Sequence, residues 1–261
     1  MELSPVDASA AGESSADFDT SHAAQGYVGV SATGSSRLKV QVTCDGESYN
    51  YDISGDGTPV VCPLNMGDGL YEISVYQNTS GNRYAILSST SVWAEMDDEF
   101  QPYIRPSVYC SYDETSACVA KAAELTAGAS CQAQAAANIY QYVIDSIKYD
   151  QAKAQELADQ TGYVPDPDET LASGTGICFD YASLTAAMMR SVGIPCKIIT
   201  GSVSPNNIYH AWNMVYLDGT WKTISFTVDP ETWTRIDATF AASGGSSTVG
   251  DGTSYIDQYT Y

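Results

Sequence analysis

The sequence has little positive charge. Its 261 residues include 11 Lys and Arg against 32 Asp and Glu, which gives a formal net charge of −21. Such a charge repels phosphate backbones, so we expect no nucleic-acid partner. It equally disfavours docking on anionic membrane surfaces. A solubilising surface explains the acidity, and calcium binding is the alternative, although no D-x-D-x-D-G loop is present.

The sequence also lacks long apolar runs. None reaches the ~18 residues that a membrane-spanning helix needs. The first residues have neither the basic start nor the apolar core of a signal peptide. Residues 1–24 are rich in Ala, Ser, Asp and Glu and predict a disordered spacer. An exported protein whose signal segment was removed fits this pattern, so we expect an extracellular or cell-surface location.

The seven cysteines form an odd count. If one is a catalytic thiol, six remain for up to three disulfides, with Cys44 and Cys62 as one candidate pair. That arithmetic suits an oxidising compartment. A cytosolic protein with seven free thiols is the alternative.

The pattern of the chain changes near residue 105. Residues 25–104 contain short alternating runs separated by Gly, Asn and Asp turns, which predict a small β-sandwich. Residues 105–261 begin with helical patterns and end with strand-like runs, which predict an α+β domain with an antiparallel sheet. We expect helices at 117–125, 131–148, 152–159 and 178–192, and strands near 196–203, 209–217, 220–228 and 232–239.

Only two histidines are available as a general base. His22 lies in the polar N-terminal segment, whereas His210 lies in a predicted strand. A catalytic histidine would therefore be His210, and an ordinary histidine on a sheet is the alternative.

Cys178 follows two glycines and opens a helical pattern. Backbone N–H groups and the positive dipole at a helix N-terminus favour thiolate over thiol, and the same groups could stabilise an oxyanion. A buried or disulfide-bonded cysteine is the alternative.

A third group should orient the imidazole. Asp218 precedes a glycine in a predicted hairpin turn, so its side chain should face water. Asp229 precedes a proline and is also turn-like. Asp237 lies in a strand-like run, where an acid needs a partner. We prefer Asp237, with Asp229 second.

Three blocks together resemble the transglutaminase-like (papain-like) superfamily. Residues 176–184 with 190–196 resemble its Cys block, residues 209–215 with 218–221 its His block, and residues 233–240 its Asp block. The N-terminal β region resembles an accessory domain of exported bacterial proteins. One departure is that the usual register of the Asp falls on Ser225, and Asp237 follows only after the extra stretch 226–232.

The resemblance implies acyl transfer by a Cys178–His210–Asp237 triad without a cofactor. Trp212 would shield the thioester, and Tyr181 and Tyr163 would contact the oxyanion or the substrate; core packing is the alternative for all three. We expect hydrolysis of a peptide or protein amide, with a cell-wall peptide as one candidate substrate. Protein crosslinking and a non-catalytic adhesion or binding scaffold are the alternatives. A zinc site is not expected, since one usable histidine and no C-x-x-C pair leave no familiar ligand cluster.

Overall fold

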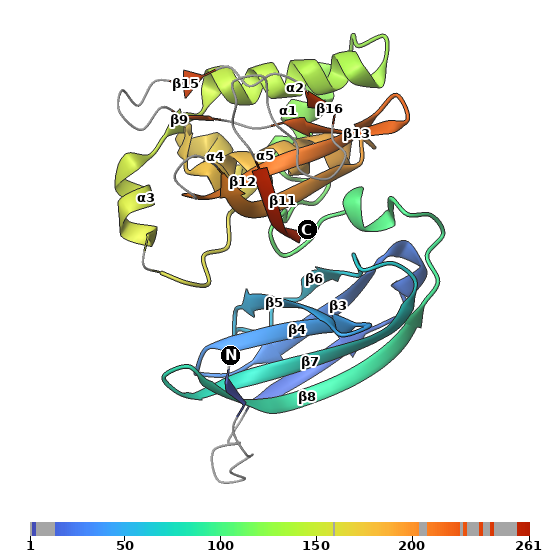
Figure 1. Ribbon diagram of the computed structural model, residues 1–261, viewed down its shortest axis with the longest axis vertical. Coiled ribbons are helices and arrows are strands. Elements are labelled where there is room, and N and C mark those ends of the chain that lie inside the picture. Colours follow the sequence, from blue (N-terminus) through green and yellow to red (C-terminus); the bar gives the residue numbers. More distant parts are fainter. Residues whose placement is uncertain are drawn as a thin grey trace. The chain divides into compact units, whose positions relative to one another are not determined.

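The computed structural model describes residues 2–3, 14–158, 160–203, 208–224, 227–228, 235–236, 241–242 and 255–261. The chain divides into two compact units (Figure 1). The first comprises Met1–Pro102 and Gly162–Val164, and the second comprises Tyr103–Thr161 and Pro165–Tyr261.

The N-terminal unit is built from two sheets. A five-stranded sheet has the order β1-β8-β7-β4-β5, and a three-stranded sheet has the order β2-β3-β6. All pairs are antiparallel except β1 with β8. The strands are β1 (Glu2–Leu3), β2 (Ser15–Asp19), β3 (Tyr27–Thr33), β4 (Leu38–Cys44), β5 (Glu47–Ile53), β6 (Val60–Pro63), β7 (Gly69–Ser80) and β8 (Arg83–Ala94).

Strict alternation of apolar and polar residues produces this unit. In β4, Leu38, Val40 and Val42 are fully buried, while the residues between them are partly exposed. Because successive strand side chains point to opposite faces, one face of the sheet forms the core. The turn after β4 places Asp45 and Gly46 at positive φ, the conformation that favours Asp-Gly in tight hairpins. The all-β prediction for this region is confirmed.

The spacer predicted for residues 1–24 is corrected in part. Ser15–Asp19 form β2, which pairs with β3 from Ser15↔Thr33 to Asp19↔Gly29. The backbone ladder with β3 fixes this strand although its composition is polar, because a strand at a sheet edge needs few apolar side chains.

The C-terminal unit contains five helices and a second five-stranded sheet within the part of the chain that is described. Its helices are α1 (Ala117–Thr126), α2 (Gln132–Ser146), α3 (Gln151–Leu157), α4 (Pro167–Ser173) and α5 (Cys178–Ser191). Its strands are β9 (Lys148–Tyr149), β10 (Thr175–Gly176), β11 (Cys196–Val203), β12 (Ile208–Leu217), β13 (Thr220–Ile224), β14 (Thr227–Val228), β15 (Arg235–Ile236), β16 (Ala241–Ala242) and β17 (Tyr255–Thr260).

Helix α5 is the centre of this unit. It contacts α1, α2 and α4 and packs on β11 and β12 of the sheet β16-β13-β12-β11-β17 (Figure 1). The strands of that sheet are antiparallel throughout. From Asp180 to Arg190 every residue of α5 is buried. The predicted α+β class with an antiparallel sheet is confirmed.

Helix α4 is not among the helices predicted from the sequence. Asp166 caps the helix by accepting hydrogen bonds from the backbone N–H groups of Asp168 (2.9 Å) and Glu169 (3.0 Å). Pro167 occupies the first helical turn, where its missing N–H costs nothing. Asp166 and Pro167 are therefore helix-start signals.

Beyond β12 the structure describes only parts of the predicted strands. Strands β13 and β14 lie within the predicted range 220–228, and β14 pairs with β15 in a separate two-stranded sheet. Asp218 and Gly219 form the predicted turn with positive φ at both residues. The Asp218 side chain is 74% exposed and pairs with Lys222, as its turn position predicted.

The seven cysteines are all free thiols in the structure, so the predicted disulfides are not formed. Cys44 and Cys62, the candidate pair, are both buried and unbridged. Among the described helices, none combines the length and the apolar character required to span a membrane.

Candidate active site

The segment that leads into α5 is held by a neighbouring strand. The backbone N–H of Lys148 donates to Gly174 O (2.8 Å), and that of Asp150 donates to Gly176 O (2.9 Å), in the parallel pairing of β9 with β10. A Cβ at Gly176 would lie 2.6 Å from the Cβ of Asp180, so no larger residue fits there. The hydrogen bonds to β9 and the close packing of Gly176 on Asp180 thus hold the backbone of the segment before Cys178 in place.

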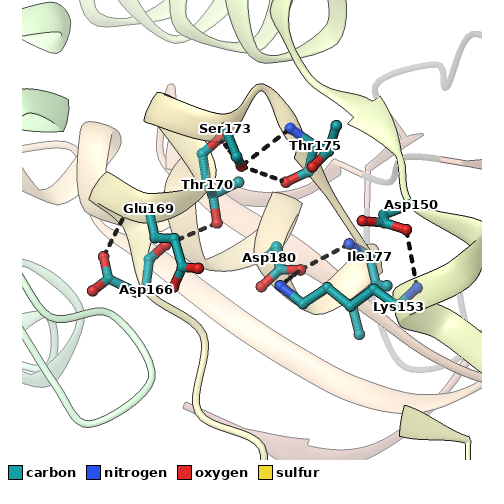
Figure 2. A network of polar contacts seen from close by, with 9 residues as sticks. All are labelled: Asp150, Lys153, Asp166, Glu169, Thr170, Ser173, Thr175, Ile177 and Asp180. Atoms are coloured by element: carbon teal, nitrogen blue, oxygen red, sulfur yellow. Dashed lines mark hydrogen bonds and ion pairs between the residues drawn. The ribbon is translucent and has the colours of Figure 1, made fainter. Parts of the chain in front are cut away.

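Asp180 fixes the start of the helix. Its carboxylate is fully buried and accepts a hydrogen bond from the backbone N–H of Ile177 (2.8 Å). The same Oδ2 atom lies 2.9 Å from Nζ of Lys153 on α3 (Figure 2). An acid in the first turn satisfies an otherwise unpaired N–H group and interacts favourably with the helix dipole. Cys178 is therefore held as the first residue of α5.

Cys178 is half-buried, and its sulfur is largely removed from water. Burial raises its pKa to about 11, while hydrogen bonds from the backbone N–H groups of Ala211 and Phe179 lower it and the charge of Asp180 raises it. The N–H groups act in the direction that the sequence predicted, but burial has the larger effect. The reason is that removing the sulfur from water disfavours the charged form more than the dipole and the N–H groups stabilise it.

His210 lies on β12 directly before Ala211. The N–H that contacts the Cys178 sulfur belongs to the peptide between His210 and Ala211. The backbone of His210 therefore lies next to the thiol. Its ring stacks on that of Trp212 with centroids 6.3 Å apart. The structure thus brings β12 and the start of α5 together at the two predicted residues.

Trp212 is 1% exposed and packs with Ile199 and Met214 on the sheet. It supports His210 from within the core.

Asn213 joins the helix to the strand and was not identified from the sequence. It is fully buried, and its Nδ2 donates to Ala182 O (2.9 Å) of α5 and to Lys197 O (3.2 Å) of β11. A polar residue inside an otherwise apolar strand was the available signal, since a buried amide needs partners.

The two tyrosines selected from the sequence have other surroundings. The Tyr181 hydroxyl is buried and donates to Ile147 O at 2.6 Å, which commits its proton to the fold. Tyr163 lies in the segment Gly162–Val164, which packs with the N-terminal unit.

Two other tyrosines lie close to the thiol. Burial raises the pKa of Tyr149 to about 12, and the next cause is the charge of the Cys178 thiolate. The pKa of Tyr209 is also raised, by burial first and by the same thiolate among the other causes. Nothing in the sequence distinguishes these two from the other tyrosines.

Asp237 and its alternative Asp229 lie outside the described residues. Strand β15 ends at Ile236, immediately before Asp237. Among the residues that the structure describes, no three His, Cys, Asp or Glu side chains are grouped as ligands for a metal ion. The described part of the site is a desolvated thiol at a helix start, opposite a strand that carries the second histidine of the chain.

The C-terminal part of the chain matches a known family. Residues 119–238 match the model of the Transglutaminase-like superfamily. This segment includes α5, β12 and the Cys, His and Asp positions discussed above. The C-terminal unit therefore contains a segment that is similar to the transglutaminase-like superfamily.

Individual relatives are similar over part of their length. The kyphoscoliosis peptidase of Homo sapiens is 31% identical over 99 residues, 34% of this chain and 14% of that protein. A UPF0252 protein of Archaeoglobus fulgidus is 27% identical over 126 residues, 43% of this chain and 40% of that protein. The aligned regions thus span well under half of either relative. A solved structure of a proposed cysteine protease from Cytophaga hutchinsonii has a TM-score of 0.42 at 21% identity, covering 49% of this chain and 42% of that one.

Proposed function

We propose that the C-terminal unit catalyses cysteine-dependent acyl transfer on peptide or protein amides, with hydrolysis as the principal outcome. Cys178 is the nucleophile, His210 the general base and acid, and Asp237 the group that orients the imidazole. The observation that carries this proposal is the contact of the Cys178 sulfur with the Ala211 N–H, next to His210. The match of residues 119–238 to the transglutaminase-like superfamily supports it.

The raised pKa of Cys178 defines how the reaction starts. Because the thiol is protonated at neutral pH, its proton moves to His210 as sulfur attacks the carbonyl carbon. The resulting oxyanion is stabilised by backbone N–H groups at the start of α5. The C–N bond then breaks, His210 returns the proton to the departing amine, and a thioester remains on Cys178.

The acceptor decides the product. When water attacks the thioester, His210 removes a proton from it, the C–S bond breaks, and a carboxylic acid and the free thiol result. When a primary amine attacks instead, the product is a new amide, which is the crosslinking reaction. We place hydrolysis first. Trp212 contributes by shielding the thioester from one side of the sheet.

The test measures amide turnover and amine incorporation on the same peptide or casein substrate. We expect release of carboxylate by the native protein, and loss of at least a hundredfold in Cys178→Ala and His210→Ala. Cys131→Ala is the matched control, since Cys131 is an exposed thiol on another part of the unit. Amine incorporation in excess of hydrolysis would assign crosslinking. If the native protein turned over no amide, and Cys178→Ala bound the peptide or casein as well as the native protein does, the unit would be assigned as a binding scaffold.

A location at the cell surface completes the proposal, with peptides of that environment, cell-wall peptides included, as substrates. The acidic, lysine-poor composition supports it. Fractionation of cells that express the full-length protein, followed by immunoblotting, tests it. Recovery only in the cytosol would refute it.

A further inference from the structure

An ion pair between the buried Asp180 and the half-buried Lys153 lies close to the nucleophile, and the proposed triad does not use it. We propose that Lys153 is a positioning residue for Cys178 that acts through Asp180. The ion pair holds the backbone at the start of α5 in place and offsets the negative charge of the Asp180 carboxylate. This inference rests on the proposed role of Cys178 as nucleophile. It assigns a function to α3, a short helix whose own residues are all at least partly exposed.

The geometry ties Lys153 to the segment before Cys178 in two ways. Asp150 caps α3 by accepting the backbone N–H of Lys153 at 2.9 Å, and its own N–H donates to Gly176 O at 2.9 Å. The Lys153 side chain then reaches Asp180 Oδ2 at 2.9 Å, which also accepts the Ile177 N–H (Figure 2). One turn of α3 therefore holds both the backbone and the charge of the helix start.

The charges around the thiol favour this arrangement. Asp180 on α5 disfavours the Cys178 thiolate, whereas Tyr149 on β9 and Tyr209 on β12 have raised pKa values and are uncharged at neutral pH. His210 on β12 can supply positive charge from the sheet side. Lys153 supplies it from the α3 side, by offsetting the one carboxylate that is fully buried within two residues of the sulfur.

A purely structural role for the pair makes a different prediction. If Lys153 only stabilised the fold, its removal would lower the unfolding temperature and leave the apparent pKa of the Cys178 thiol unchanged. If it offsets Asp180, its removal exposes the thiol to an uncompensated negative charge. The apparent pKa of the thiol then rises, because a nearby like charge disfavours the thiolate.

The experiment follows alkylation of native protein by iodoacetamide as a function of pH, with the label at Cys178 quantified by peptide mapping. In Lys153→Met we expect the Cys178 profile to move up by about one pH unit, an approximately tenfold slower reaction at fixed pH below the midpoint. In the double variant Lys153→Met/Asp180→Asn, which removes both charges and keeps an acceptor for Ile177, we expect a profile at or below the wild-type pH. Lys121→Met is the matched control, since it breaks an exposed helical ion pair with Glu124.

Each possible result either supports or overturns the proposal. A Lys153→Met profile that coincides with the wild type overturns the proposal, as does a double variant that keeps the upward shift. If Lys153→Met alone fails to fold, the double variant decides: a profile at or below the wild-type pH supports the proposal, and one at higher pH overturns it. Alkylation needs no amide turnover, so an inactive wild-type protein would refute the proposed function without changing this outcome.

Discussion

Replacing His210 by Ala separates two opposing influences on the Cys178 thiol. Burial raises its pKa from an ordinary value of 9.0 to about 11. A protonated His210 imidazole, as the proposed counter-ion of the thiolate, would act in the other direction. In His210→Ala that counter-ion is absent, and the raised pKa that burial mainly sets remains.

The size of the effect follows from the two pKa values. Between 9.0 and 11 lie two pH units, so at neutral pH the Cys178 thiolate is about a hundredfold scarcer than that of an ordinary thiol. The alkylation rate tracks the thiolate fraction. We therefore expect Cys178 in His210→Ala to react about a hundredfold more slowly than an ordinary exposed thiol at pH 7, and to accelerate tenfold per pH unit up to about pH 11.

The assay has an internal reference. Iodoacetamide labels Cys131, an exposed thiol, in the same sample, and peptide mapping gives the ratio of the two rates. Unfolding the variant in denaturant should bring the ratio close to one, which shows that the fold causes the difference. Equal labelling of Cys178 in wild type and His210→Ala at every pH would refute the coupling between the two residues. A fast reaction of Cys178 in native His210→Ala at pH 7 would refute the burial argument itself.

Three further predictions concern the framework of the unit and its stability. Gly176→Ala should lower the free energy of unfolding by about 1–3 kcal/mol, because its Cβ would lie 2.6 Å from that of Asp180, and should reduce Cys178 alkylation; chemical denaturation and peptide mapping check this. Arg190→Met should cost about 3–5 kcal/mol in the same denaturation assay, because the buried guanidinium donates to three backbone carbonyls at 2.8–3.0 Å; a loss below ~1 kcal/mol would contradict this account. Burial raises the pKa of Cys62 to about 12 and of Cys110 to about 11, so both thiols hold their protons in the folded state after the unfolded chain has lost them. The stability they contribute is complete below the ordinary thiol pKa of 9.0 and falls as pH rises from there towards 11–12, by roughly 1.4 kcal/mol per pH unit and thiol; thermal unfolding between pH 8 and 10.5 should show it, and a flat profile would contradict it.

Some of the fold could be read directly from local patterns. The helical pattern that begins at Cys178 predicted α5, and the strand-like run around His210 predicted β12. The Asp218-Gly219 pair predicted a hairpin turn. Helix α4 was missed although Asp166, Pro167 and Glu169 form an ordinary helix start. The capping pattern was therefore available, so this error lies in the interpretation and not in the sequence.

The sequence by itself determined which residues could act as nucleophile and base, because reactive side chains are few: two histidines in the whole chain and one cysteine at a Gly-rich helix start. Only the tertiary structure decided the state of that thiol. Its desolvation, the Ala211 N–H that contacts it and the pairing of Asp180 with Lys153 all involve segments distant in sequence. Tyr149 and Tyr209 likewise approach the site only through folding. The physical reason is that ionisation depends on solvent access and on nearby charges, and both are properties of the packed chain.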